Sequence, residues 1–295
     1  MHNPSILQLV GNTPLVACRN IIQNPKVILF FKLEGLNPGG SVKDRPALNM
    51  IQSALERGEI NTNTKLIEAT SGNTGIALAM IAGVFGLDIE LVMPENATKE
   101  RVQTMRAYGA KVTLTSSDVG IEGARDYAED KVNREGYFMM NQFANPDNWK
   151  AHYKSTGPEI WRDTAGEITH FVSSMGTTGT IMGTSTYLKE QNSNVEIVGV
   201  QPTEGSRIPG IRKWPEAYLP KIFNPEKVDR IMEVNQDESI AMAKRLAKEE
   251  GIFSGMSSGG AATAALQLAE TLDEGVIVSI VCDRGDRYLS SGIFE

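Results

Sequence analysis

The sequence contains few of the residues that build disulfide frameworks or metal centres. It has two cysteines and three histidines in 295 residues. Cys18 and Cys282 lie far apart and form no CxxC or Cys/His spacing, so we expect neither a disulfide framework nor a metal site. Cys282 ends an apolar run, a position where a cysteine is more often inert packing than a nucleophile.

An excess of basic charge and long apolar runs are also missing. Lysine and arginine number 29 against 36 aspartates and glutamates, which gives a formal net charge of −7 and no general attraction to nucleic acid or anionic membrane. No apolar run approaches the roughly 20 residues needed to cross a bilayer. Residues 1–9 lack a basic-then-apolar signal pattern. We therefore expect a cytoplasmic protein that binds neither nucleic acid nor membrane.

The signatures of two large enzyme classes are absent as well. Neither GxxxxGK[ST] nor GxGxxG with a downstream acid occurs, which disfavours a nucleotide enzyme. The GxSxG motif of α/β-hydrolases is missing, and His2, His152 and His170 show no pairing with a serine or cysteine nucleophile. Triad hydrolysis therefore has little support.

What is present is a regular alternation of apolar runs and helix-like stretches. Short β-branched runs predict strands at 27–33, 66–67, 89–93, 112–114, 171–172, 196–200 and 276–282. Helix-like stretches lie between them, at 42–57, 74–85, 99–108, 121–133, 178–190, 239–250 and 259–272. The alternation predicts an α/β fold, and the continuous apolarity of most strands predicts parallel sheets that helices cover on both faces.

Two stretches interrupt this pattern. The polar segment 141–148 marks a domain boundary near residue 146, which separates a region 1–146 from a region 147–295. The Gly/Pro-rich stretch 202–220 predicts a long excursion over the surface of the second domain. Excursions of that length often carry function.

The segment 37–46, with the sequence NPGGSVKDRP, is a turn that runs into a helix and places Lys43 at the helix start. A cation there opposes the helix dipole, which favours the neutral amine and its use as a nucleophile toward an aldehyde. A Schiff-base role is therefore reasonable. The alternative is a solvated lysine in a capping segment, with Ser41 as the cap and Asp44 in the first turn.

Two further loops each join a strand to a helix. The segment 68–75, EATSGNTG, offers hydroxyls and free N–H groups suited to a carboxylate, while Asn73 adds an amide for a ring hydroxyl or a substrate oxygen. The segment 173–180, SSMGTTGT, reads as a phosphate cradle because its glycines allow close backbone approach and its threonines supply donors. The alternatives are helix caps in the first loop and a tight turn without ligand in the second.

Two late segments lie where an α/β fold binds ligands, at the carboxyl ends of its strands. These are 254–260, SGMSSGG, before a helix, and 282–288, CDRGDRY, after the strand 276–281. Each by itself favours a capping or solvated role.

Together these segments resemble the fold-type II pyridoxal-phosphate (PLP) family of cysteine synthases, over nearly the whole chain. The resemblance begins with NTPL at 12–15 and continues through the Lys43 segment, TSGNT at 70–74 and the glycine-threonine loop at 176–180. Four stretches resemble the B form of that family more than the A form: 174–180, 208–215, 251–255 and 282–290.

The resemblance implies a tryptophan-synthase-β-like fold, with two three-layer α/β/α domains and PLP in the cleft between them. The smaller, mobile domain would span about 40–146, and residues before about 38 would pack with the larger domain. Lys43 would hold PLP as a Schiff base and serve as acid and base at the substrate α-carbon, Asn73 would contact the ring oxygen and Ser257 would face the pyridine nitrogen. The phosphate would be held by Gly176, Thr177, Thr178, Gly179 and Thr180.

The implied reaction replaces the acetate of O-acetylserine with sulfide to give cysteine, in a cytoplasmic homodimer. Thr70, Ser71, Thr74 and Gln142 would grip the substrate carboxylate. The B-like stretches add thiosulfate as a second sulfur donor, with Arg212 facing its sulfonate or, alternatively, standing as a solvated charge on a loop. Cystathionine β-synthase and serine/threonine dehydratase activities share the lysine and the phosphate loop and are the alternatives, and a noncatalytic scaffold is a third.

Overall fold

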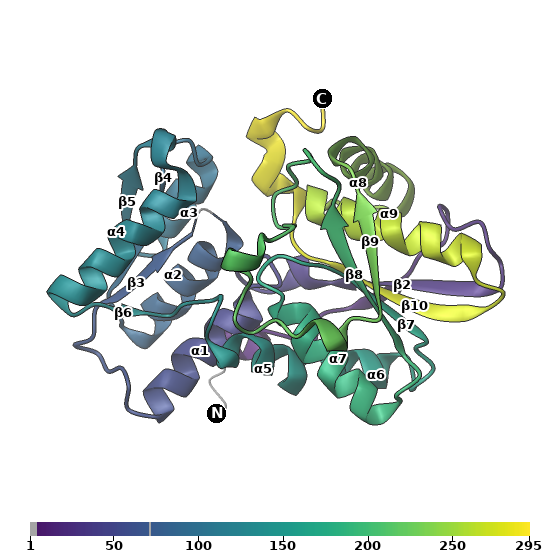
Figure 1. Ribbon diagram of the computed structural model, residues 1–295, viewed down its shortest axis with the longest axis horizontal. Helices are drawn as coiled ribbons and strands as arrows, with labels where there is room; N and C mark the ends of the chain where they lie inside the picture. Colours follow the sequence, from purple (N-terminus) through teal and green to yellow (C-terminus); the bar gives the residue numbers. More distant parts are fainter. Residues whose placement is uncertain (1–4, 71) are drawn as a thin grey trace.

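The computed structural model describes residues 5–70 and 72–295. Its strands form two separate sheets, one of six strands and one of four, which Figure 1 shows side by side with helices around each. Across the described ranges, no helix is both long and apolar enough to cross a membrane.

The six-stranded sheet has the order β1-β2-β10-β7-β8-β9. Its strands are β1 (Leu15–Ala17), β2 (Val27–Leu33), β7 (His170–Ser174), β8 (Glu196–Pro202), β9 (Arg230–Val234) and β10 (Gly275–Val281). All pairs are parallel except β1 with β2. Because β2 pairs with β10, the first strands of the chain belong to the same sheet as the last.

Helices cover both faces of this sheet, so neighbouring residues of its strands enter different cores. Phe171 and Ile197 pack in one core, whereas Val172 and Val198 pack in the other. Period-two alternation with both sides apolar explains why these strands read as continuous hydrophobic runs. The covering helices are α5 (Pro146–Lys154), α6 (Thr156–Asp163) and α7 (Gly179–Gln191) on one side and α8 (Gln236–Glu250) and α9 (Met256–Thr271) on the other.

The four-stranded sheet is parallel throughout and has the order β5-β4-β3-β6. Its strands are β3 (Leu66–Ala69), β4 (Ile89–Pro94), β5 (Lys111–Thr115) and β6 (Phe138–Met139). Leu66 and Leu91 face one core while Ile67 and Val92 face the other. The helices of this part are α1 (Asp44–Glu56), α2 (Asn73–Phe85), α3 (Lys99–Ala107) and α4 (Gly120–Glu135).

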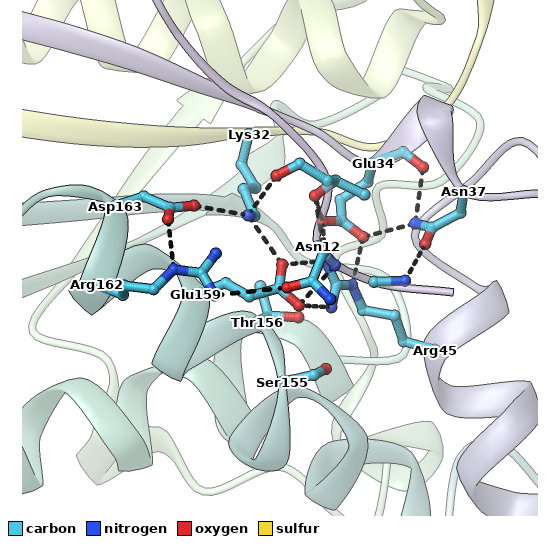
Figure 2. A network of polar contacts seen from close by, with 12 residues as sticks. Asn12, Lys32, Glu34, Asn37, Arg45, Ser155, Thr156, Glu159, Arg162 and Asp163 are labelled. Carbon is cyan, nitrogen blue, oxygen red and sulfur yellow. Dashed lines mark hydrogen bonds and ion pairs between the residues drawn. The ribbon is translucent and has the colours of Figure 1, made fainter. Parts of the chain in front are cut away.

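A buried ionic network holds the start of α1 against the six-stranded part (Figure 2). The Arg45 guanidinium, in the first turn of α1, pairs with Glu34 and Glu159, each at 2.7 Å. Lys32 of β2 reaches Glu159 of α6 at 2.9 Å and Asp163 at 3.4 Å. We call these five residues the Arg45 network. It fixes the helix that follows Lys43 to two other elements of the chain.

Several elements were not predicted from the sequence. These are the strands β1, β6 and β9 and the helices α5 and α6, each of which is short. The polar segment 141–148 contains the start of α5: the Asn145 side chain accepts from the Asp147 N–H, and Pro146 takes the first helical position. The Gly/Pro-rich excursion matches the prediction, since 203–229 contains only two 3₁₀ turns, Glu216–Tyr218 and Pro225–Lys227.

Candidate functional site

A cavity of about 1200 Å³ lies between the two parts of the molecule. It gathers loops that follow strands of both sheets, as expected at the carboxyl ends of parallel strands. The predicted site residues that line it are Lys43, Thr70, Asn73, Thr74, Gln142, Gly176, Thr177, Thr178, Thr180, Arg212 and Ser257. Gly179 begins α7 directly behind the loop, and Ser71 lies outside the described residues.

Lys43 is the N-cap residue of α1, and its side chain lines the cavity. Burial is the largest influence on its amine and lowers its pKa, while Cys282, Asp283 and Glu34 act in the opposite direction. The lowered pKa agrees with the predicted direction, and burial contributes to it in addition to any effect of the helix dipole. Ser41 is not the N-cap: its hydroxyl accepts from the Lys43 N–H at 3.2 Å.

The glycine-threonine loop ends at Thr178, the N-cap of α7, whose φ of 69° lies in the left-handed region. Its Oγ1 is buried and has no hydrogen-bond partner among the described residues. The 13-residue helix α7 begins at the same place, and the N–H groups of its first turn have no partners within the helix. An orphan hydroxyl beside free amide donors and the positive end of a helix dipole suits an anion such as a phosphate.

Two positions of this loop, 176 and 179, have no room for a side chain larger than that of glycine. A Cβ on Gly176 would lie 2.7 Å from the Gly210 carbonyl oxygen, and one on Gly179 would lie 2.0 Å from the Asn148 amide oxygen. Behind the loop, His152 Nε2 shares a hydrogen bond of 3.3 Å with the Thr180 hydroxyl. Burial lowers the pKa of His152 well below its usual range, so this imidazole is neutral.

The loop after β3 brings two predicted residues into one contact. The Thr74 hydroxyl, in the first turn of α2, donates to Gln142 Oε1 at 2.7 Å. Thr70 is buried, and its hydroxyl accepts from the Gly72 N–H at 3.4 Å. Hydroxyls, an amide and a helix N-terminus thus face the cavity together, as a carboxylate site requires.

Asn73 is held by two residues of the late segment 282–288. Its amide nitrogen donates to Asp283 Oδ2 at 2.7 Å, and its amide oxygen accepts from the Arg287 guanidinium. The Tyr288 hydroxyl donates to the same Asp283 oxygen at 2.6 Å. The late segment therefore orients the Asn73 side chain from across the cavity.

Ser257 lies in the first turn of α9 and is buried. Its carbonyl accepts from the Ser174 hydroxyl at 2.8 Å, which ties α9 to the end of β7. Cys282 also lines the cavity, and burial raises the pKa of its thiol to about 12. This thiol is protonated at neutral pH, in keeping with the predicted inert role. Cys18 and Cys282 are both free.

Arg212 is exposed on the long excursion, at the mouth of the cavity. Its guanidinium stacks 5.3 Å from the Trp214 ring centre, and the Trp214 indole N–H donates to the Gly176 carbonyl at 2.7 Å. The excursion thus reaches the phosphate loop through a residue that sequence reasoning missed.

Asn148, Asp283 and Trp214 are the main site residues not predicted as such. Asn148 binds the Gln142 carbonyl at 2.7 Å from the first turn of α5, and the Asn145-Pro146 pair was the signal that could have predicted this helix. The contacts of Asp283 and Trp214 depend on tertiary placement and carried no local signal. No group of three or more His, Cys, Asp or Glu side chains placed to hold a metal occurs in the part of the chain that the structure describes.

An amine of lowered pKa and an anion cradle in one cavity suit an aldehyde that carries a phosphate. Comparisons with known proteins agree. The family model described as "Pyridoxal-phosphate dependent enzyme" matches residues 6–283. The chain is 59% identical to cysteine synthase B of Pseudomonas aeruginosa, over 99% of this chain and 98% of that protein.

It is 55% identical to cysteine synthase B of Escherichia coli, over 97% of this chain and 95% of that protein. Among solved structures, the cysteine synthase of Entamoeba histolytica superposes with a TM-score of 0.94 at 37% identity. That match covers 100% of this chain and 91% of the other.

Proposed function

The chain belongs to the family of pyridoxal-phosphate dependent enzymes and, within it, to the cysteine synthases, and on this premise we propose that it makes L-cysteine from O-acetyl-L-serine and sulfide. The observation that carries the proposal is the position of Lys43, which shares one cavity with the anion cradle at the start of α7. Cystathionine synthesis and dehydration use the same lysine and loop, but the identities of 59% and 55% to two cysteine synthases B favour cysteine.

The residues present fit PLP. The Lys43 amine would bind its aldehyde, residues 176–180 its phosphate, Asn73 its ring oxygen and Ser257 its pyridine nitrogen. The orphan Thr178 hydroxyl and the open N–H groups of α7 support the phosphate assignment. When bound, PLP withdraws electrons from the substrate α-carbon and makes its proton acidic. Ser257 would donate a hydrogen bond to the pyridine nitrogen and would not stabilise a protonated ring as an aspartate does, so the electron withdrawal would be weaker.

The chain itself binds the substrate and moves its proton. Thr70, Thr74 and Gln142, together with Ser71 outside the described residues, would hold the carboxylate of O-acetylserine at the start of α2. The amine of Lys43 would take the α-proton while acetate leaves the β-carbon, and would return a proton after sulfide has added there. Closure of a smaller mobile domain, about 40–146, over the carboxylate would exclude water during these steps.

The test combines a spectrum with one substitution. The purified protein should show an absorption band in the visible range, and this band should shift when O-acetylserine is added without sulfide. Lys43→Ala should abolish steady-state formation of cysteine. Lys26→Ala, at an exposed lysine remote from the cavity lining, is the matched control and should keep normal turnover. Near-normal turnover of Lys43→Ala would refute the role assigned to Lys43. An absorption band that does not change with O-acetylserine would show that the substrate is a different compound.

We further propose that thiosulfate serves as a second sulfur donor, giving S-sulfocysteine, with Arg212 facing the sulfonate. The exposed guanidinium at the cavity mouth supports this role. Arg212→Ala should lower kcat/KM for thiosulfate about tenfold or more, as expected for one lost charge-assisted contact, with little change for sulfide. An unchanged preference between the two donors would reject it.

We also propose a cytoplasmic homodimer, on the strength of the acidic sequence and of the family resemblance. Light scattering on the eluting holoenzyme measures the mass directly. A peak at the 32.1 kDa of one chain would exclude the dimer.

A further inference from the structure

A buried carboxylate stands behind the loop that carries Gln142. Glu68 lies on β3 and is 2% exposed. Its Oε2 accepts from the Asn141 N–H at 2.9 Å and its Oε1 from the Gln142 N–H at 3.4 Å. The carboxylate therefore satisfies two successive backbone donors that would otherwise lack partners.

The turn that Glu68 holds has a conformation that needs support. Asn141 has a φ of 53°, in the left-handed region, which asparagine adopts more readily than most residues other than glycine but still at some cost. Gln142 is then fixed from both sides, because Asn148 donates to its carbonyl at 2.7 Å while Glu68 accepts from its N–H. This backbone aims the Gln142 side chain at the Thr74 hydroxyl, 2.7 Å away.

We propose that Glu68 is a positioning residue for the substrate: its carboxylate fixes the backbone at Asn141 and Gln142 and so places the Gln142 amide beside Thr74, where the carboxylate of O-acetylserine binds. The proposal deepens the proposed function and rests on it. Glu68 is not part of the cavity lining, so it would act through the turn and through Gln142 rather than by contact with the substrate.

The charge environment of Glu68 supplies a readout that a merely structural role would lack. Burial is the largest influence and raises the pKa of Glu68 to about 7, opposed by the two backbone hydrogen bonds, by Arg125 of α4 and by the Gln142 side chain. Its β-sheet partners on β4 and the turn residues that it contacts are uncharged. Above pH 7 the ionised carboxylate accepts both N–H bonds at full strength, and below it a proton competes for one oxygen.

The chain offers a matched control in Glu90. This glutamate lies on the neighbouring strand β4, is also 2% exposed, and pairs with Lys111, Tyr137 and other side chains instead of the turn. Both glutamates can be changed to glutamine in the holoenzyme, and KM and kcat for O-acetylserine measured between pH 6 and 8.5 at saturating sulfide.

We expect Glu68→Gln to raise KM for O-acetylserine about tenfold, the effect of one lost charge-assisted bond, with kcat changed less than threefold. In the wild type, kcat/KM for O-acetylserine should fall as pH drops below about 7 (the acidic limb of the profile), and this fall should be absent in Glu68→Gln. Glu90→Gln should leave KM and the limb unchanged. If Glu68→Gln keeps the wild-type KM and limb, or if both variants shift KM alike, the positioning role is wrong.

Two further variants keep the test decisive. If Glu68→Gln does not fold, Glu68→Asp replaces it, and an unchanged KM in that variant contradicts the proposal. In a Gln142→Ala background, Glu68→Gln should have no further effect on KM, because the turn has nothing left to position, whereas additive effects would overturn the coupling. A wild-type protein that makes no cysteine refutes the proposed function instead, whatever the variants do.

Discussion

Two groups of buried carboxyl groups in this molecule have pKa values shifted in opposite directions. Glu34 and Glu159 belong to the Arg45 network, which ties α1 to the six-stranded part (Figure 2). Asp44 and Glu68 lie beside the cavity, and their hydrogen bonds come chiefly from backbone N–H groups. Burial acts to raise the pKa of all four carboxyl groups, and only their partners differ.

In the Arg45 network the partners prevail. Burial alone would raise the pKa of Glu159, but hydrogen bonds and charge from Arg45 and Lys32 bring it down to about 2. Glu34 shifts in the same direction through Arg45, Thr13 and Lys32. At the cavity, burial prevails and raises the pKa values of Asp44 and Glu68 to about 7.

The Arg45 network has a structural role, whereas Asp44 and Glu68 lie beside the candidate functional site. Fully paired ions are costly to disturb, so the network holds α1, and with it Lys43, in one position. Carboxyl groups that lack an ion pair, such as Asp44 and Glu68, have pKa values raised toward neutral pH by burial. Predictions that break one group and spare the other test this division.

The largest effect should follow Arg45→Met, which leaves Glu34 and Glu159 buried without their shared cation. We expect a loss of about 3–5 kcal/mol in the free energy of unfolding, measured by urea denaturation of the holoenzyme. Arg245→Met removes an exposed i,i+4 pair with Glu249 on α8 and should cost at most about 0.5 kcal/mol. Equal losses in the two variants would show that the network adds nothing beyond a surface pair.

How far these features were predictable depends on whether their cause is local. β2 was predicted with its observed bounds, 27–33, because an apolar run defines it. α2 and α3 were predicted to within one residue, because Gly86 and Gly109 mark where these helices stop. The short strands β1 and β9 are partly exposed, with weak apolar patterns that need the neighbouring strand to be recognised. α5 was missed because its asparagine cap resembled a linker.

The same distinction applies to the site. The loops at Lys43, at 70–74 and at 176–180 were predictable, since each joins a strand or turn to a helix and all meet where parallel strands end. The contact of Asn73 with Asp283, 210 positions later in the chain, was not. Nor was the contribution of burial to the lowered pKa of Lys43, because burial is a property of the packed molecule.

A smaller effect should appear in the pH dependence of stability. The pKa of Glu68 is raised from 4.5 to about 7, so the folded state binds this proton more tightly than the unfolded state does. The bound proton therefore adds to the free energy of unfolding at low pH, and that addition is lost as pH rises from 4.5 through 7. Relative to Glu68→Gln, the wild-type free energy of unfolding should therefore fall by up to roughly 3 kcal/mol between pH 4.5 and 8.

Glu159 provides the opposite case. Its pKa is lowered to about 2, so its contribution is fully present above about pH 4.5 and is lost only as pH falls below that value. The difference between the wild type and Glu159→Gln should thus stay flat from pH 4.5 to 8. Urea denaturation at each pH measures both, and parallel slopes for the two variants would contradict the comparison.

The smallest effect concerns a neutral member of the scaffold. The Thr13 hydroxyl donates to Glu34 Oε1 at 2.7 Å and accepts from Arg45 Nη2 at 3.1 Å. Thr13→Val keeps the shape and removes one hydrogen bond from each ion, while the ion pair itself remains, so we expect a loss of about 1–2 kcal/mol in the free energy of unfolding. Thr113→Val, which removes a 2.7 Å bond to Glu90 at a half-exposed site, is the control and should cost less. Water can reach the half-exposed position 113 and replace part of the lost hydrogen bond, whereas it cannot reach the buried ions beside Thr13. A larger loss at Thr113 than at Thr13 would therefore contradict this expectation.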